Sequence, residues 1–209
     1  MWNLLALGAS SVRYKPTASS GTITNPTYAY DADESPWATY ANVSYTGSSV
    51  AGTPDNNIVD FTTFGTLNKA NFSSLTLSYV YDFTITPAWA SGVSGYVVTA
   101  NFDILYSTDG GTTWTTGQDF KITYSNNGLY YASLYPATDI SATGSGIGTA
   151  LTSSLVKVES SVILPSSAFS SGLQDLQIRF ISSTLESVRA GSPSSTCSYK
   201  VWDIRAEVS

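Results

Sequence analysis

The sequence contains no histidine and a single cysteine in 209 residues. Without histidine, the Ser-His-Asp and Cys-His catalytic sets and every histidine-ligated metal site are excluded. Cys197 has no second cysteine with which to form a disulfide, and it cannot build a zinc or iron–sulfur cluster alone. We expect a small buried or half-buried residue there. The sequence therefore predicts a protein without enzymatic activity, stabilised by its core or by oligomerisation.

Charge is also scarce, since Asp, Glu, Lys and Arg make up 11% of the chain. Nine basic residues against 15 acidic ones give a net charge of -6, which leaves too few cations to neutralise a nucleic-acid backbone or bind an anionic membrane. No apolar run is long enough to span a bilayer, and the first residues lack the basic start of a secretory signal. We expect synthesis in the cytoplasm of a host cell, with no nucleic-acid or membrane partner.

The abundant residues are those of strands and turns: Ser and Thr, with 14 Tyr and 16 Gly. Two long stretches place an apolar side chain at every second position, which is the period of a strand with one buried face. They are Leu75, Leu77, Tyr79, Tyr81, Phe83 and Ile85, and then Tyr96, Val98, Ala100, Phe102, Ile104 and Tyr106. The first strand is expected to end at Pro87, and residues 87–95 to form a loop.

Shorter stretches predict further strands at 118–124 and 128–135, and three more near the end of the chain. The Gly/Ser/Thr-rich residues Ser141–Ser154 have little to bury and are expected to form a mobile or surface loop. Long strands joined by loops of very different lengths favour an antiparallel jelly roll or β-sandwich over a barrel or propeller. We expect one such domain over residues 21–209. The last three strands are marked by Val156, Val158 and Val162, by Leu176, Ile178 and Phe180, and by Trp202, Ile204, Ala206 and Val208.

Residues 1–20 begin with a short apolar group and continue as a polar run. Two interpretations stay open: an N-terminal arm that docks on a neighbouring subunit, or a first strand in the domain's own sheet. In the first case the contacts to the partner are made by Trp2, Leu4, Leu5 and Leu7.

A compact motif lies between two predicted strands, with the spacing Ser-x-Asp-x-Gly-x-Thr-Trp over Ser107–Trp114. An aspartate can accept hydrogen bonds from turn amides, glycine tolerates positive φ, and the indole ring can cover the hairpin. The motif resembles the Asp-box of sialidase-like propellers, in which it is a fold element remote from the chemistry. A propeller carries several copies, whereas this chain has one. We therefore expect a structural hairpin.

Residues 25–41 (NPTYAYDADESPWATYA) and the final stretch 199–208 (YKVWDIRAEV) resemble the first and last parts of galactose-binding-like, discoidin-type jelly rolls. The resemblance covers most of residues 21–209 and speaks to fold more than to activity. Such domains often hold a structural calcium in the first loop, which here implies Asp31 and Asp33, with Glu34 beside them. The alternative is that both aspartates bond turn amides and Glu34 is solvated, with no cofactor bound.

Carboxylates are the remaining source of catalysis, since a glycosidase needs two that face each other. No spacing singles out such a pair, and Asp103 and Glu159 are expected on the solvated faces of their strands. The acidic residues considered are Asp103, Glu159, Asp175, Glu186 and Asp203.

Jelly rolls of this composition are similar to structural proteins of tailed bacteriophages, such as decoration, fibre and baseplate proteins. This resemblance implies a virion structural protein, most specifically a capsid decoration protein that adheres to neighbouring subunits, either the major capsid protein or tail proteins. We expect a homo-oligomer. The alternative is a carbohydrate-binding module of a tail fibre, baseplate or cell-surface protein, with a glycan stacked on Trp37, Trp89 or Tyr130.

Overall fold

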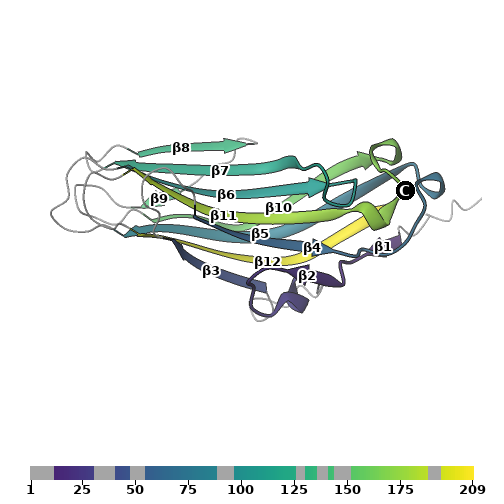
Figure 1. The fold of residues 1–209 in the computed structure, drawn as a ribbon, viewed down its shortest axis with the longest axis horizontal. Coiled ribbons are helices and arrows are strands. Elements are labelled where there is room, and N and C mark those ends of the chain that lie inside the picture. Colours follow the sequence, from purple (N-terminus) through teal and green to yellow (C-terminus); the bar gives the residue numbers. More distant parts are fainter. Residues whose placement is uncertain are drawn as a thin grey trace, which may run out of the picture.

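A computed structural model describes residues 12–30, 41–47, 55–88, 97–125, 130–135, 141–143, 152–187 and 194–209. Two antiparallel sheets face each other along most of the molecule (Figure 1). Sheet A has the order β1-β12-β5-β10-β9, with β3 also paired to β12, and sheet B has the order β2-β4-β11-β6-β7-β8. Among the described residues, no helix is long and apolar enough to cross a membrane.

The strands of the two sheets are interleaved along the chain. Sheet A contains β1 (Val12–Tyr14), β3 (Ala41–Gly47), β5 (Ser74–Ala88), β9 (Ser141–Thr143), β10 (Thr152–Pro165) and β12 (Ser194–Val208). Sheet B contains β2 (Ala18–Ser20), β4 (Asp55–Thr62), β6 (Val97–Ser107), β7 (Thr115–Ser125), β8 (Tyr130–Tyr135) and β11 (Gln177–Ser187). The short 3-10 helices are η1 (Pro26–Tyr30), η2 (Lys69–Asn71), η3 (Ser166–Ala168) and η4 (Leu173–Asp175).

Eight of these strands have jelly-roll order. The inner part of sheet A reads β3-β12-β5-β10, and the facing part of sheet B reads β4-β11-β6-β7. The chain changes sheet at most connections, for example from β10 to β11 and from β11 to β12, while β6 and β7 form a local hairpin. The expected class, an antiparallel jelly-roll β-sandwich, is therefore confirmed.

Aromatic and aliphatic side chains fill the space between the sheets. The alternating residues of β5 from Leu75 to Phe83 are each at most 3% exposed, which confirms the strand period seen in the sequence. Phe102 of β6 lies at the centre, with its ring centroid 5.2 Å from that of Phe83 and 4.8 Å from that of Tyr199. Such aromatic contacts add to the stabilisation from buried area.

Two sequence expectations about strand ends were wrong. β5 does not end at Pro87 but continues to Ala88, and Pro87 pairs in register with Ser195 of β12. Proline is tolerated there because β10 pairs with β5 only as far as Ile85, so one side of the strand needs no N–H donor. The expected loop Ser141–Ser154 contains β9 and the start of β10, since Ser and Thr there pair through their backbones.

The structure describes the N-terminal region from residue 12 onward. β1 pairs with the end of β12 and β2 pairs with the end of β4, so residues 12–14 and 18–20 belong to the domain's own sheets. The four residues proposed as partner contacts, Trp2, Leu4, Leu5 and Leu7, lie outside the described residues.

Candidate functional site on the β6–β7 hairpin

The Ser107–Trp114 motif forms a self-contained turn between β6 and β7. The Asp109 carboxylate accepts hydrogen bonds from the backbone N–H of Thr113 (2.9 Å), the hydroxyl of Thr113 (2.6 Å) and the hydroxyl of Ser107 (2.7 Å). Gly110 and Gly111 have φ values of 72° and 87°, in the left-handed region that favours glycine. The expectation of a structural hairpin is confirmed.

The turn also determines the charge state of its aspartate. Three groups donate to Asp109, first the hydroxyl and backbone N–H of Thr113 and then the hydroxyl of Ser107, and they lower the pKa of its carboxyl to about 2. Each of these donors stabilises the ionised form. Asp109 is therefore a fixed anion that organises the turn.

Backbone contacts attach this turn to residues 166–176, the connection that carries the chain from β10 in sheet A to β11 in sheet B. The hydroxyl of Thr108 donates to the carbonyl of Ala168 (2.8 Å), and the N–H of Ser170 donates to the carbonyl of Thr108 (3.1 Å). The N–H of Gly110 donates to the carbonyl of Asp175 (3.0 Å). We call residues 107–114 and 166–176 together the clasp, because they join the two sheets at one end.

A second aspartate and a lysine complete the clasp. The Asp175 carboxylate accepts from the backbone N–H groups of Ser171 and Gly172, and these donors lower its pKa although burial alone would raise it. The ammonium group of Lys69 donates to the carbonyls of Phe169 (3.1 Å) and Ser170 (2.9 Å). The acidic and basic side chains of this end are thus bound to groups of the same chain.

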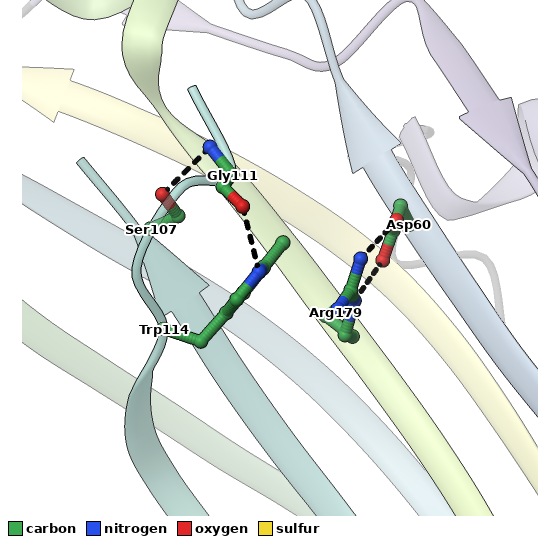
Figure 2. Close-up of polar contacts among 5 residues, drawn as sticks. All are labelled: Asp60, Ser107, Gly111, Trp114 and Arg179. Carbon is green, nitrogen blue, oxygen red and sulfur yellow. Dashed lines mark hydrogen bonds and ion pairs between the residues drawn. The ribbon is translucent and has the colours of Figure 1, made fainter. Parts of the chain in front are cut away.

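A stacked row of side chains lies beside the turn on the outer face of sheet B (Figure 2). The Arg179 guanidinium forms two bonds with the Asp60 carboxylate (2.6 and 2.8 Å), which raise the pKa of Arg179 further. Its central carbon lies 3.9 Å from the centroid of the Trp114 ring, a cation–π contact. The indole N–H of Trp114 donates to the carbonyl of Gly111 (3.0 Å). This row connects β4, β11 and the turn.

A different pair of acidic side chains lies further along the same hairpin. Asp103 of β6 and Asp119 of β7 are direct partners in register. Their neighbours Phe102, Ile104 and Gln118 are buried between the sheets, so both carboxyls project from the outer face of sheet B. Burial is the largest cause that raises the pKa of Asp103, to about 7, followed by a hydrogen bond to Asp119 and repulsion by its charge. Asp103 can therefore keep a proton near neutral pH.

A glycosidase needs two carboxyls about 5 Å or more apart with the sugar between them. Asp103 and Asp119 are instead direct neighbours on adjacent strands, close enough for one to affect the pKa of the other. Asp103 was expected on a solvated face; it does face outward but is half-buried. Glu159 is exposed, as expected. Among the described residues, no three acidic or cysteine side chains gather in a way that could hold a metal ion.

Several predicted site residues fall outside what the structure describes. The calcium candidates Asp31 and Asp33, and the glycan candidates Trp37 and Trp89, lie outside the described residues. Tyr130 begins β8, but only its backbone is described. The calcium and glycan hypotheses therefore stay predictions. Of the aspartates named from the sequence, Asp175 caps the clasp connection and Asp203 pairs with Arg205.

No protein-family model, no curated protein and no solved structure matches the chain. The resemblance to galactose-binding-like domains stays a prediction, because jelly-roll strand order occurs in many families with unrelated functions. The functional argument therefore depends on the fold and on the contacts described above.

Proposed function

We propose that the chain is a structural protein of a tailed-phage virion, a capsid decoration protein that acts by adhesion to neighbouring subunits and not by catalysis. The observation that supports it most is the distribution of apolar side chains. Aromatic rings fill the space between the sheets, while aliphatic side chains are exposed at opposite edges of sheet A, where Ile163 is 71% and Val12 is 53% exposed. Apolar groups at a protein surface are typical of contact with other proteins.

The use of the polar side chains agrees with this proposal. Asp109 and Asp175 are bound within the clasp, and Asp60 is paired with Arg179. These contacts stabilise the fold and hold the two sheets together at one end. A protein shell component needs such a stable body more than it needs a reactive group.

The experiment that tests the proposal is cryo-electron microscopy of intact particles from the phage that encodes this chain. We expect ordered density for the chain on the capsid lattice, in contact with the major capsid protein. A few copies at the tail tip would instead support receptor or glycan binding. Absence of the chain from particles, checked by mass spectrometry of the same preparation, would overturn the virion proposal.

The N-terminal arm gives the proposal a second test. β1 begins at Val12, so deletion of residues 1–11 leaves every described strand intact. We expect the shortened protein to keep its unfolding temperature and to lose attachment to particles, because Trp2, Leu4, Leu5 and Leu7 would be gone. Full attachment of the shortened protein would show that the arm is not the contact.

A further inference from the structure

Among the described residues, β10 has a strand partner on only one side over much of its length. β5 pairs with β10 on one side from Ser153 to Pro165, whereas β9 pairs on the other side only at Thr152–Ser154. In the part of the chain that the structure describes, no strand pairs with 158–165 on the side away from β5. Alternate backbone N–H and C=O groups of this segment therefore point out of the sheet, where a further strand can bind them.

The features that usually prevent such pairing, a bulge and a proline, lie at the ends of this segment and not within it. The register with β5 shifts between Leu155 and Val158, and Pro165 ends the strand. Bulges and prolines of this kind interrupt edge pairing. Between them the strand keeps a regular register with β5, and Glu159 is its only charged residue. The segment is therefore a regular edge that can pair with a further strand.

The edge also carries the most exposed large apolar side chain among the described residues. Ile163 faces outward and is 71% exposed, although its neighbour Leu164 is 5% exposed in the core. Isoleucine on an exposed strand costs solubility and favours association. An exposed isoleucine beside a strand edge that no further described strand pairs with distinguishes this side of sheet A from the opposite side, where β1 and β3 pair with β12.

We propose that two copies of this chain pair through their β10 edges, antiparallel, about a two-fold axis that places Ser161 opposite Ser161 of the second copy. Glu159 of each copy then lies opposite Ile163 of the other, and the aliphatic part of the glutamate covers the isoleucine. Val158 lies opposite Leu164, which continues both cores across the junction.

A second copy fits this edge because the sequence is self-complementary in that register. No charged residue lies opposite a like charge, and the two Glu159 carboxylates are four residues apart along the strands, about 14 Å. The same surface patch serves both copies, as a two-fold interface requires. The inference goes beyond the proposed function, since a dimer in solution does not depend on attachment to a virion.

Sedimentation velocity of the full chain tests this pairing. We expect the wild type to sediment at twice the 22.2 kDa mass of one chain. Ile163→Glu places a carboxylate directly opposite Glu159 of the second copy and should weaken the dimer by about tenfold or more, while circular dichroism shows an intact fold. The matched control is Val12→Glu, which changes an exposed aliphatic residue at the opposite edge of the same sheet and should stay dimeric.

Disulfide trapping tests the register in a Cys197→Ser background. Ser161→Cys should give a covalent dimer on mild oxidation. Ser78→Cys should not, because Ser78 lies on the same outer face but within β5, between β10 and β12. Trapping at position 78 with none at 161 would overturn the edge pairing.

The remaining outcomes separate this inference from the proposed function. A wild type that stays monomeric at its highest soluble concentration would overturn the dimer, and a dimer unaffected by Ile163→Glu would overturn its β10 pairing. A monomer that attaches to capsids through this edge would assign β10 to a strand of another protein, which overturns self-pairing but leaves the virion role. A β10 dimer in solution, with the chain absent from particles, would overturn the virion role and leave the self-pairing of β10 supported.

Discussion

Two aspartates on one hairpin, six residues apart, have opposite electrostatic environments. Asp109 lies in the turn, where hydroxyl and backbone donors lower its pKa to about 2. Asp103 lies within β6, where burial and a neighbouring carboxyl raise its pKa to about 7. The difference shows that residue type and sequence distance do not determine the role of a carboxyl group; its burial and the donors that reach it do.

The two environments follow from local backbone geometry. The turn curls its N–H groups toward Asp109, because two glycines adopt positive φ. A regular strand instead uses its N–H groups in the ladder, so Asp103 finds only the side chains of its neighbours, and one of its carboxyl oxygens is buried without a hydrogen-bond partner. The first carboxylate stabilises the fold at neutral pH, and the second opposes it.

The variant expected to have the largest effect is Asp109→Ala. It removes the acceptor of three hydrogen bonds, releases the turn and loosens the contacts of Thr108 and Gly110 with residues 166–176. We expect the largest fall in unfolding temperature among the variants discussed here, measured by calorimetry at pH 7. Asp109→Asn is the matched control, because its amide oxygen can still accept a hydrogen bond from Thr113. Its unfolding temperature should fall less than that of Asp109→Ala.

The pH dependence of that loss has a defined sign. The folded pKa of Asp109 lies below the unfolded value of 3.8, so its contribution is present above pH 4 and disappears as the pH falls through about 2. The difference between wild type and Asp109→Ala should therefore shrink only in strong acid. A difference that vanished near pH 5 would contradict this account of the turn.

Asp103→Asn should act in the opposite direction. The folded pKa of Asp103 lies above its unfolded value of 3.8, so its contribution is fully present below about pH 4 and is lost as the pH rises through about 7. At pH 8 the substitution should raise the free energy of unfolding by about 1–2 kcal/mol, less than the full linkage of the shift because solvent screens part of the group. Urea denaturation at pH 5 and pH 8 measures this.

A companion variant separates the causes of the shift. Asp119→Asn removes the neighbouring charge but leaves Asp103 buried. Because burial is the largest cause, we expect most of the pH dependence between pH 4 and 7 to remain in Asp119→Asn and to disappear in Asp103→Asn. Equal loss in both variants would show that repulsion, and not burial, dominates.

The same hairpin shows what could be predicted from the sequence. The Ser107–Trp114 turn was predictable because each of its residues acts within eight positions of chain, and the long strands β5 and β6 were predictable because their inward residues are apolar at every second position. The order of the strands and the identity of facing residues depend on contacts distant in sequence, which no local pattern encodes. Thus β4, in which Val59 and Phe61 are the buried side chains among the described 57–62, was not predicted.

The Asp103–Asp119 pair shows a further limit. Counting outward from the turn pairs Tyr106 with Thr115 and Leu105 with Thr116, and the same count would place Asp103 opposite Gln118. The register shifts after Leu105, with Gly117 as the extra residue, so Asp103 meets Asp119 instead. A one-residue bulge therefore creates the pair, and bulges leave only a weak signal in sequence.

The smallest expected effect concerns the row that connects the turn to sheet B. Arg179→Lys keeps the positive charge but loses the two-pronged bond to Asp60 and the flat group stacked on Trp114. We expect a loss of about 1 kcal/mol in the free energy of unfolding. Arg13→Lys is the control, because the Arg13 side chain is 56% exposed in its pair with Glu207. This variant should lower the free energy of unfolding by only a few tenths of the loss in Arg179→Lys. Urea titrations measure both losses. If the two variants lost the same free energy of unfolding, the charge of Arg179 alone would explain its contribution to stability, and the stacked row would have no structural role of its own.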